Sequence, residues 1–237
     1  MISKVERVVP EPDAASLRNV RSTTSRSLVD KMPLLDPTAR EESQRFIERV
    51  FASATADRPR ILAFSGADTG VGCTFVATSI ARTLAENEDS RVCLLDGDMR
   101  SSSSASSWLL ETREVPNSSI GFEPIQVGER LWFQSCRFAF RSDVQQFDQE
   151  KLAALLIALK SEFDYVIVDT APIMRYTETT LISRLVDGLV IVVEAYSSRR
   201  HVVRKVAEYL TGTRITCLGA ILNNRTFPIP SLFYDRL

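Results

Sequence analysis

The sequence predicts an α/β protein with a doubly wound, mainly parallel sheet flanked by helices. Short apolar runs alternate along the chain with stretches of helical periodicity, and the runs lack the apolar–polar alternation of a half-exposed strand. Such strands are buried on both faces, as in a parallel sheet covered by helices. Three of the runs end in Ser65, Asp96 and Asp169, and the strand ends of open α/β sheets are where ligands bind.

The chain divides into an extension and one domain. Residues 1–37 are rich in Pro, Ser, Thr, Arg and acidic residues, so we expect a flexible N-terminal extension. Residues 38–237 form the predicted domain, which can build a sizeable core because 44% of the chain is apolar. A helix is expected over residues 37–54, where Phe46 and Phe51 follow helical spacing.

The remainder of the domain alternates strands and helices, with an irregular stretch between the second and third strands. Because the apolar runs do not alternate, we expect every strand to be buried on both faces. The expected strands cover residues 60–65, 92–96, 131–135, 166–169, 189–194 and 215–222. The expected helices cover residues 75–84, 149–163, a stretch between the fourth and fifth strands, and 201–211.

Composition and charge exclude several function classes. The net charge of −1 gives no electrostatic reason to expect nucleic-acid binding. The apolar run at residues 188–193 is far shorter than the roughly 20 residues that span a bilayer, and the N-terminus lacks the apolar core of a secretory signal. The cysteines show no paired metal spacing, which predicts free thiols in a reducing compartment. We therefore expect a cytoplasmic protein without a membrane span of its own.

A glycine-rich segment after the first strand has the pattern of a phosphate-binding P-loop, or Walker A loop. Such a loop directs backbone N–H groups at phosphate, its lysine adds positive charge at the β- and γ-phosphates, and its Ser/Thr ligates Mg²⁺. Cys73 stands where the lysine belongs, whereas the glycines and Thr74 are retained. The predicted cofactor-binding residues of the loop are Gly70, Val71, Gly72, Cys73, Thr74 and Phe75.

Three aspartates complete the predicted site. Asp96 and Asp98 stand at the end of one strand, and Asp169 stands at the end of another. These acids and the loop should converge, because the carboxyl ends of parallel strands meet at one edge of a sheet. Oxygen ligands beside a phosphate cradle imply Mg²⁺. We predict Asp96, Asp98 and Asp169 as catalytic residues, and Thr74, Asp96 and Asp169 as metal ligands.

The three segments, in this order, resemble the bacterial tyrosine kinases of capsule and exopolysaccharide systems, a branch of the ParA/MinD-like P-loop ATPases. Residues 94–100 match that family's apolar residues followed by Asp-x-Asp-x-Arg, and residues 166–172 match its third motif. The resemblance implies a P-loop NTPase-like fold with ATP or ADP and Mg²⁺ as cofactors. It also implies that Asn223 and Arg225 contact the base, although a surface loop would explain these two residues equally well.

The chain departs from this family at several positions. The signature lysine near the start of the loop corresponds to Asp68 or a neighbour, and the tyrosine run that ends the kinases is reduced to Tyr234. The family's ring-forming motif, Glu-x-x-Arg-x-x-Arg, is met by Glu42 and Arg45, but position 48 is Glu. A solvated helix face with i,i+3 pairs explains these residues as well, so a homo-oligomer is left open.

One basic cluster could replace the lost charge of the loop lysine. Arg199, Arg200 and His201 begin the helix after the fifth predicted strand, a place close to the nucleotide in such folds. A solvated basic turn is the favoured interpretation of these residues.

Together with the lost lysine, the resemblance implies a kinase-like regulator, a pseudokinase, that partners a membrane polysaccharide co-polymerase or chain-length protein in exopolysaccharide biosynthesis and export. Nucleotide binding should be weak and turnover weak or lost, since the lysine mainly stabilises charge that develops during phosphoryl transfer. We expect the protein to be peripheral to the inner membrane through that partner. An active ATP-dependent protein-tyrosine autokinase is the alternative. A MinD- or ParA-like positioning ATPase fits less well, because of Arg100 and the lack of a C-terminal amphipathic helix.

Overall fold

A seven-stranded sheet with the order β3-β4-β2-β7-β1-β8-β9 forms the centre of the protein. The computed structural model describes residues 37–51, 59–87, 90–98, 124–136, 139–141 and 146–224. All neighbouring strands are parallel except β3, which runs antiparallel to β4. This confirms the predicted fold class. The strands are β1 (Ile61–Gly66), β2 (Val92–Asp96), β3 (Ile125–Gln126), β4 (Leu131–Ser135), β7 (Tyr165–Thr170), β8 (Gly188–Glu194) and β9 (Cys217–Asn223).

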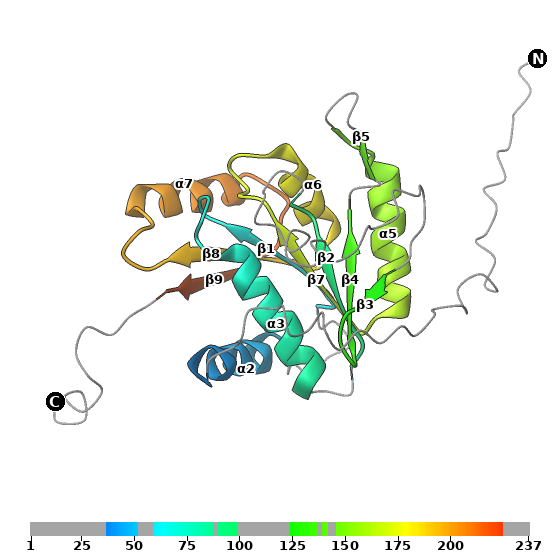
Figure 1. The fold of residues 1–237 in the computed structure, drawn as a ribbon. Helices are drawn as coiled ribbons and strands as arrows, with labels where there is room; N and C mark the ends of the chain where they lie inside the picture. Colours follow the sequence, from blue (N-terminus) through cyan, green and yellow to red (C-terminus); the bar gives the residue numbers. More distant parts are fainter. Residues whose placement is uncertain are drawn as a thin grey trace, which may run out of the picture.

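Helices cover both faces of the sheet (Figure 1). The helices are α2 (Pro37–Phe51), α3 (Cys73–Asn87), α5 (Gln149–Glu162), α6 (Thr177–Leu185) and α7 (Arg200–Thr211). Alternate residues of each buried strand join two separate cores. Leu62 and Phe64 of β1 pack in the core with α2 and α3, whereas Ile61 and Ala63 pack in the core with α5, α6 and α7. This is why the central strands are apolar without alternation.

The first turn of α3 begins earlier than the sequence predicts. The expected helix started at residue 75, but α3 starts at Cys73 and includes Thr74. The amide of Val76 donates to the Gly72 carbonyl oxygen at 3.0 Å, which closes the first helical turn directly on the glycine-rich segment. The side chains at positions 73 and 74 are therefore fixed by the helix.

Three short strands lie where the sequence predicts none. β3 falls in the stretch expected to be irregular, and the hairpin of β5 (Phe140–Arg141) with β6 (Gln146–Phe147) lies between the third expected strand and the helix that follows it. Each is only two residues long, so none produces an apolar run that periodicity could detect. The hairpin leads into α5, where the Asp148 side chain accepts a hydrogen bond from the Lys151 amide and caps the helix.

The prediction that every strand is buried on both faces is wrong for β9. Leu218 is 42% exposed and Leu222 is 52% exposed. The physical reason is the position of β9 at the edge of the sheet, where β8 is its single neighbour among the described strands. The apolar run therefore predicts the strand correctly, but it does not predict whether both faces of that strand are buried.

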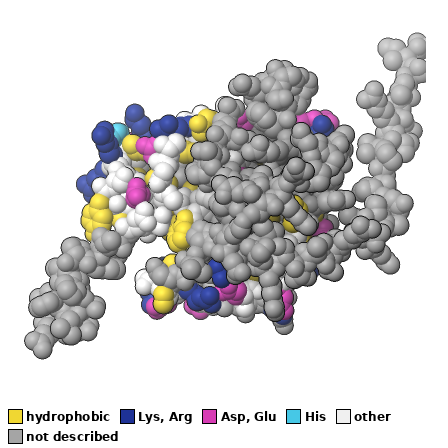
Figure 2. Space-filling model, in the orientation of Figure 1, with side chains coloured by type: hydrophobic (Ala, Val, Ile, Leu, Met, Phe, Trp, Pro, Cys, Tyr) yellow, Lys and Arg dark blue, Asp and Glu magenta, His cyan; other side chains and the backbone are white. Residues whose placement is uncertain are grey.

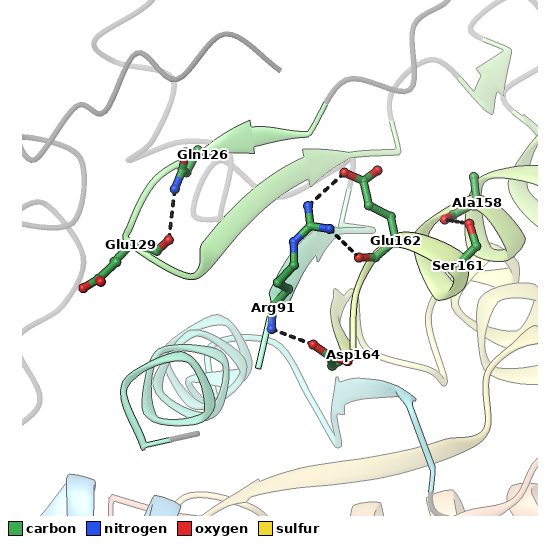
Figure 3. A network of polar contacts seen from close by, with 7 residues as sticks. All are labelled: Arg91, Gln126, Glu129, Ala158, Ser161, Glu162 and Asp164. Atoms are coloured by element: carbon green, nitrogen blue, oxygen red, sulfur yellow. Dashed lines mark hydrogen bonds and ion pairs between the residues drawn. The ribbon is translucent and has the colours of Figure 1, made fainter. Parts of the chain in front are cut away.

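A polar network fastens the edge of the sheet where β2 starts (Figure 3). The backbone amide of Arg91 donates to Asp164 at 2.8 Å, and its guanidinium donates to the Glu162 carbonyl at 3.0 Å and to the Glu162 carboxylate at 3.1 Å. The guanidinium also lies over the rings of Trp132 and Phe163. These contacts join the end of α5 to the start of β2. They lie where the parallel strands begin, and the predicted site lies where those strands end.

Several sequence predictions fall on positions outside the described residues. They are the extension at residues 1–36, Arg100, Arg225 and Tyr234. No helix among the residues that the structure does describe combines the length and apolarity needed to cross a bilayer.

Candidate functional site

The glycine-rich loop between β1 and α3 keeps a backbone that only glycine adopts readily. Gly70 has φ 77° and Gly72 has φ 80°, both in the left-handed region. A Cβ on Gly72 would overlap the side-chain amide of Asn223, whereas a Cβ on Gly70 would meet nothing within 4 Å. The Asn223 amide donates to the Val71 carbonyl oxygen at 2.9 Å. The last residue of β9 therefore holds the loop in place.

The two strand-end aspartates meet at one point of the sheet, as the sequence predicts. Asp96 of β2 and Asp169 of β7 are register partners on parallel strands, so their side chains lie on the same face. Asp96 is 1% exposed, Asp98 is 8% exposed and Asp169 is fully buried at 0%. The Asp98 amide donates to the Asp96 carboxylate at 3.1 Å. All three predicted acids therefore belong to one buried cluster.

Hydrogen bonds between neighbouring strands make this edge of the sheet rigid. The Gly97 amide donates to the Asp169 carbonyl at 2.8 Å, and the Thr170 hydroxyl donates to the Phe64 carbonyl at 2.8 Å. The Ser65 hydroxyl donates to the Ala171 carbonyl at 2.9 Å. These bonds fix the positions from which the acids and the loop project.

The carboxylate of Asp169 has no hydrogen-bond partner among the described residues. Burial raises its pKa to about 7, and the charges of Asp96 and Asp98 act in the same direction. Thr74 and Cys73 lie close enough to lower that pKa in part. A buried carboxylate without a partner is costly, and a cation beside it would remove the cost. None of the described groups that set the pKa of Asp169 is a cation.

Cys73 occupies the place where the charge of a loop lysine would stand. Burial and then the negative charge of Asp169 raise the pKa of the Cys73 thiol well above its usual value. The side chain is therefore a neutral thiol at physiological pH, facing the carboxylate that a loop lysine would face. It can neutralise the negative charge of neither Asp169 nor a phosphate.

A basic side chain that sequence reasoning missed lies against the loop. The guanidinium of Arg175 pairs with the carboxylate of Asp68 at 2.8 Å. The Thr69 amide also donates to Asp68 at 2.8 Å. The hydrogen bond from the Thr69 amide has the largest effect on the pKa of Asp68. Together with Arg175 it holds that pKa below its usual value, against the opposing effect of burial. The sequence feature that could have indicated this contact is an arginine in the segment that follows Asp169.

The other candidates from sequence behave as surface residues. Arg199 and Arg200 are exposed at the start of α7, over which Figure 2 shows Lys and Arg side chains gathered, in agreement with a solvated basic turn. Arg45 pairs with Glu41 at 2.7 Å and with Glu42 at 2.9 Å on the exposed side of α2. This is the pairing expected of a solvated helix face.

The residues of this site meet some of the requirements for binding a magnesium nucleotide. The loop presents a helix N-terminus, Thr74 offers a hydroxyl, and Asp169 offers a carboxylate without a partner. In the described ranges, no group of three or more His, Cys, Asp or Glu residues could hold a metal ion. A P-loop Mg²⁺ needs no such group, because phosphate and water oxygens supply most of its ligands. The assignments of Thr74, Asp96 and Asp169 as ligands remain predictions.

The four cysteines are free thiols, as expected from their spacing. Cys93 and Cys136 are buried, Cys73 is partly buried, and Cys217 is exposed on β9. Burial raises the pKa of Cys93 and Cys136 well above that of an ordinary thiol. These two thiols are consequently packing residues.

Comparison with protein families and curated proteins yields matches over most of the chain. A ParA family profile, described as the NUBPL iron-transfer P-loop NTPase, matches residues 58–232. A "Cytosolic Fe-S cluster assembly factor NUBP1 homolog" of Brugia malayi is 31% identical over 185 residues, which are 73% of this chain and 59% of that protein. Its counterpart in Caenorhabditis elegans is 27% identical over 190 residues, 75% of this chain and 60% of that protein. The chain therefore spans less than two thirds of the length of these relatives.

Solved structures with the same fold include bacterial kinase domains. The kinase domain of the Escherichia coli tyrosine kinase ETK superposes with a TM-score of 0.66 and 21% identity, covering 80% of this chain and 78% of that one. The VpsO kinase domain gives 0.59 and 19% identity, covering 80% and 95%. A ParA family ATPase from Chlorobium tepidum gives 0.56 and 15% identity, covering 76% and 80%. At these identities the likeness concerns the fold alone.

Proposed function

Because the chain belongs to the ParA family of P-loop NTPases, we propose that it is a nucleotide-binding regulator with impaired phosphoryl transfer. One observation carries this proposal: the neutral thiol of Cys73 faces the buried Asp169 carboxylate in a loop whose Gly70 and Gly72 have positive φ. The bound nucleotide would act as a regulatory signal, and the protein would turn it over slowly or not at all.

Nucleotide binding and phosphoryl transfer depend on different parts of this site. Backbone amides of the loop and the N-terminus of α3 can hold the phosphates of a ground-state nucleotide. Transition-state stabilisation needs positive charge where negative charge develops, and position 73 supplies none. Asp169, when ionised and without a cation, also repels phosphate. Catalysis should therefore be reduced more strongly than binding.

We further propose that the regulated partner is a membrane polysaccharide co-polymerase, with the chain bound to it on the cytoplasmic side of the inner membrane. Two observations support this assignment. Residues 94–100 match the Asp-x-Asp-x-Arg motif of the exopolysaccharide tyrosine kinases, and the fold resembles the ETK and VpsO kinase domains. The partner would supply the membrane attachment, and nucleotide would control the affinity between the two proteins.

Co-purification from detergent-solubilised membranes tests the partnership. An affinity-tagged chain is isolated from its native cells with added ATP, with added ADP, or without nucleotide, and co-eluting proteins are identified by mass spectrometry. We expect an integral membrane protein of a polysaccharide system to co-elute in amounts that depend on nucleotide. Elution of the chain without a membrane partner in all three conditions would overturn this assignment.

Iron–sulfur cluster assembly is a second candidate function, favoured by the 31% identity to a relative described as an assembly factor. The thiols of this chain argue against cluster binding by the chain alone. Two of its four cysteines are buried, and the described residues hold no metal-binding group of His, Cys, Asp or Glu. Iron–sulfur clusters are held by several Cys thiolates.

Anaerobic reconstitution with ferrous iron and sulfide distinguishes the two functions. We expect no cluster absorbance in the visible spectrum of the desalted protein. A stable brown product containing iron and acid-labile sulfide, lost in Cys217→Ser, would favour cluster assembly over the regulatory function.

A further inference from the structure

We propose that Arg175 is the phosphate-binding cation of this loop, and that Asp68 occupies Arg175 as an internal competing anion when no nucleotide is bound. This inference rests on the proposed nucleotide binding and goes beyond it, since it names the residue that replaces the lysine. It also assigns a role to the acidic residue near the start of the loop.

The contacts of Asp68 are those that a phosphate oxygen would make. Its carboxylate accepts hydrogen bonds from the Arg175 guanidinium at 2.8 Å and from the Thr69 backbone amide at 2.8 Å. Guanidinium groups and loop amides are the donors that proteins use for phosphate. Asp68 therefore resembles a bound anion supplied by the protein itself.

The fold places these two residues at the same edge of the sheet. Asp68 follows β1 and Arg175 follows β7, and these strands pair in parallel up to Ser65 and Thr170. The turn that carries Arg175 is closed by its amide donating to the Pro172 carbonyl at 3.0 Å. This end of the sheet also holds Asp169 and the start of α3. Asp68 belongs to the loop between β1 and α3, so the guanidinium lies against that loop.

The ion pair is exposed enough to exchange partners. The side chain of Arg175 is 53% exposed and that of Asp68 is 44% exposed. Exposed pairs of this kind contribute little to stability, so separating them costs little. A polyphosphate offers more negative charge and several oxygens to a guanidinium that can bind two of them at once. Nucleotide should consequently displace Asp68.

Calorimetric titration with pyrophosphate, ADP, ATP and adenosine tests this exchange. In Arg175→Gln, the affinity for the three phosphate ligands should fall by about tenfold, because a charge-assisted contact is lost. In Asp68→Asn, it should rise by about twofold to fivefold, because the competing anion is gone. Neither substitution should change the binding of adenosine, which carries no phosphate.

Lys160→Gln is the matched control. It removes one positive charge from the ion pair of Lys160 and Asp187, which is similarly exposed and lies at the opposite edge of the sheet. Its affinity for all four ligands should equal that of the wild type. Circular dichroism and thermal denaturation of each variant show whether the fold is retained.

Replacement of Cys73 by Lys separates this inference from the proposed function. In Cys73→Lys, the added Arg175→Gln change should cost less than threefold in affinity, since the lysine now supplies the charge. If Arg175→Gln binds the phosphate ligands as tightly as the wild type, the role of Arg175 is refuted while nucleotide binding stands. If wild type, Asp68→Asn and Cys73→Lys all fail to bind, both the inference and the proposed nucleotide binding are refuted.

Discussion

Asp96 and Asp169 occupy paired positions on the neighbouring parallel strands β2 and β7, and both carboxylates lie on the face that α3 covers. This pairing brings two acidic side chains together in a buried place. Burial and the charges of Asp96 and Asp98 raise the pKa of Asp169 to about 7. The cluster therefore holds buried acidic groups next to Cys73, whose side chain carries no positive charge.

Cys73→Lys should strengthen nucleotide binding. The new ammonium would lie beside the Asp169 carboxylate and at the predicted phosphate position, and such a contact is worth about 1.5 to 3 kcal/mol. The affinity for magnesium ATP or ADP should therefore rise by about tenfold to a hundredfold, measured by calorimetric titration with and without Mg²⁺. Asp96→Asn is the companion variant, in which the magnesium dependence should disappear. If neither Cys73→Lys nor the wild type bound nucleotide measurably, the loop would be no phosphate cradle.

Asp169 should make the protein less stable as the pH rises. Its pKa is about 7 in the folded protein against a usual 3.8, so the folded state binds the proton more tightly. The stabilisation is complete below pH 3.8 and is lost as the pH rises towards 7. The free energy of unfolding should fall by about 1.4 kcal/mol per pH unit in this window. Urea denaturation of wild type and Asp169→Asn between pH 5 and about pH 8 should show this slope in the wild type only.

Asp187→Asn is the control for that pH dependence. Burial raises the pKa of Asp187, but the hydrogen bond from Lys160 and those from the Arg60 and Ile61 amides outweigh burial and hold the pKa below 3.8. Its contribution to stability is thus present above its usual pKa and lost only in acid. Asp187→Asn should lower the free energy of unfolding by a constant amount between pH 5 and about pH 8 and leave the slope intact. A wild-type slope that survives in Asp169→Asn would contradict the assignment to Asp169.

Gly72→Ala should damage the loop more than Gly70→Ala. Both positions have positive φ, so each substitution carries a backbone cost of about 1 kcal/mol. Only at Gly72 would the new methyl group overlap the Asn223 amide that holds Val71. Thermal and urea denaturation should show a larger loss of stability in Gly72→Ala. Adding Asn223→Ala should make this difference smaller, and an unchanged difference would exclude the overlap as its cause.

Incubation with ATP and Mg²⁺ should leave the purified protein without phosphotyrosine. The reason is the absence of a lysine charge at position 73, which phosphoryl transfer in P-loop proteins uses to stabilise the developing charge. Mass spectrometry of the incubated protein measures the modification. Substantial phosphate on Tyr234 that disappears in Asp98→Asn or Asp169→Asn would support the active autokinase instead.

Much of the fold and part of the site follow from the sequence alone. Unbroken apolar runs predict the parallel strands, because each strand must be compatible with a helix layer on both faces. The convergence of Asp96, Asp98 and Asp169 follows from parallel topology, since strand ends of one polarity share an edge. The absence of a lysine at position 73 can be read directly from the sequence. These conclusions depend on neighbouring residues or on rules that hold for any parallel sheet.

Tertiary structure decides the rest. The sequence does not reveal the pairing of Arg175 with Asp68 or of Asn223 with Val71, because these partners come from separate elements and meet only through the paths of the connecting turns. It also predicts burial for β9, whose edge position leaves Leu218 and Leu222 exposed. Local periodicity determines which segments become strands and helices. The pairing of charged side chains depends on contacts between residues that are distant in the sequence. These contacts exist only once the chain is folded.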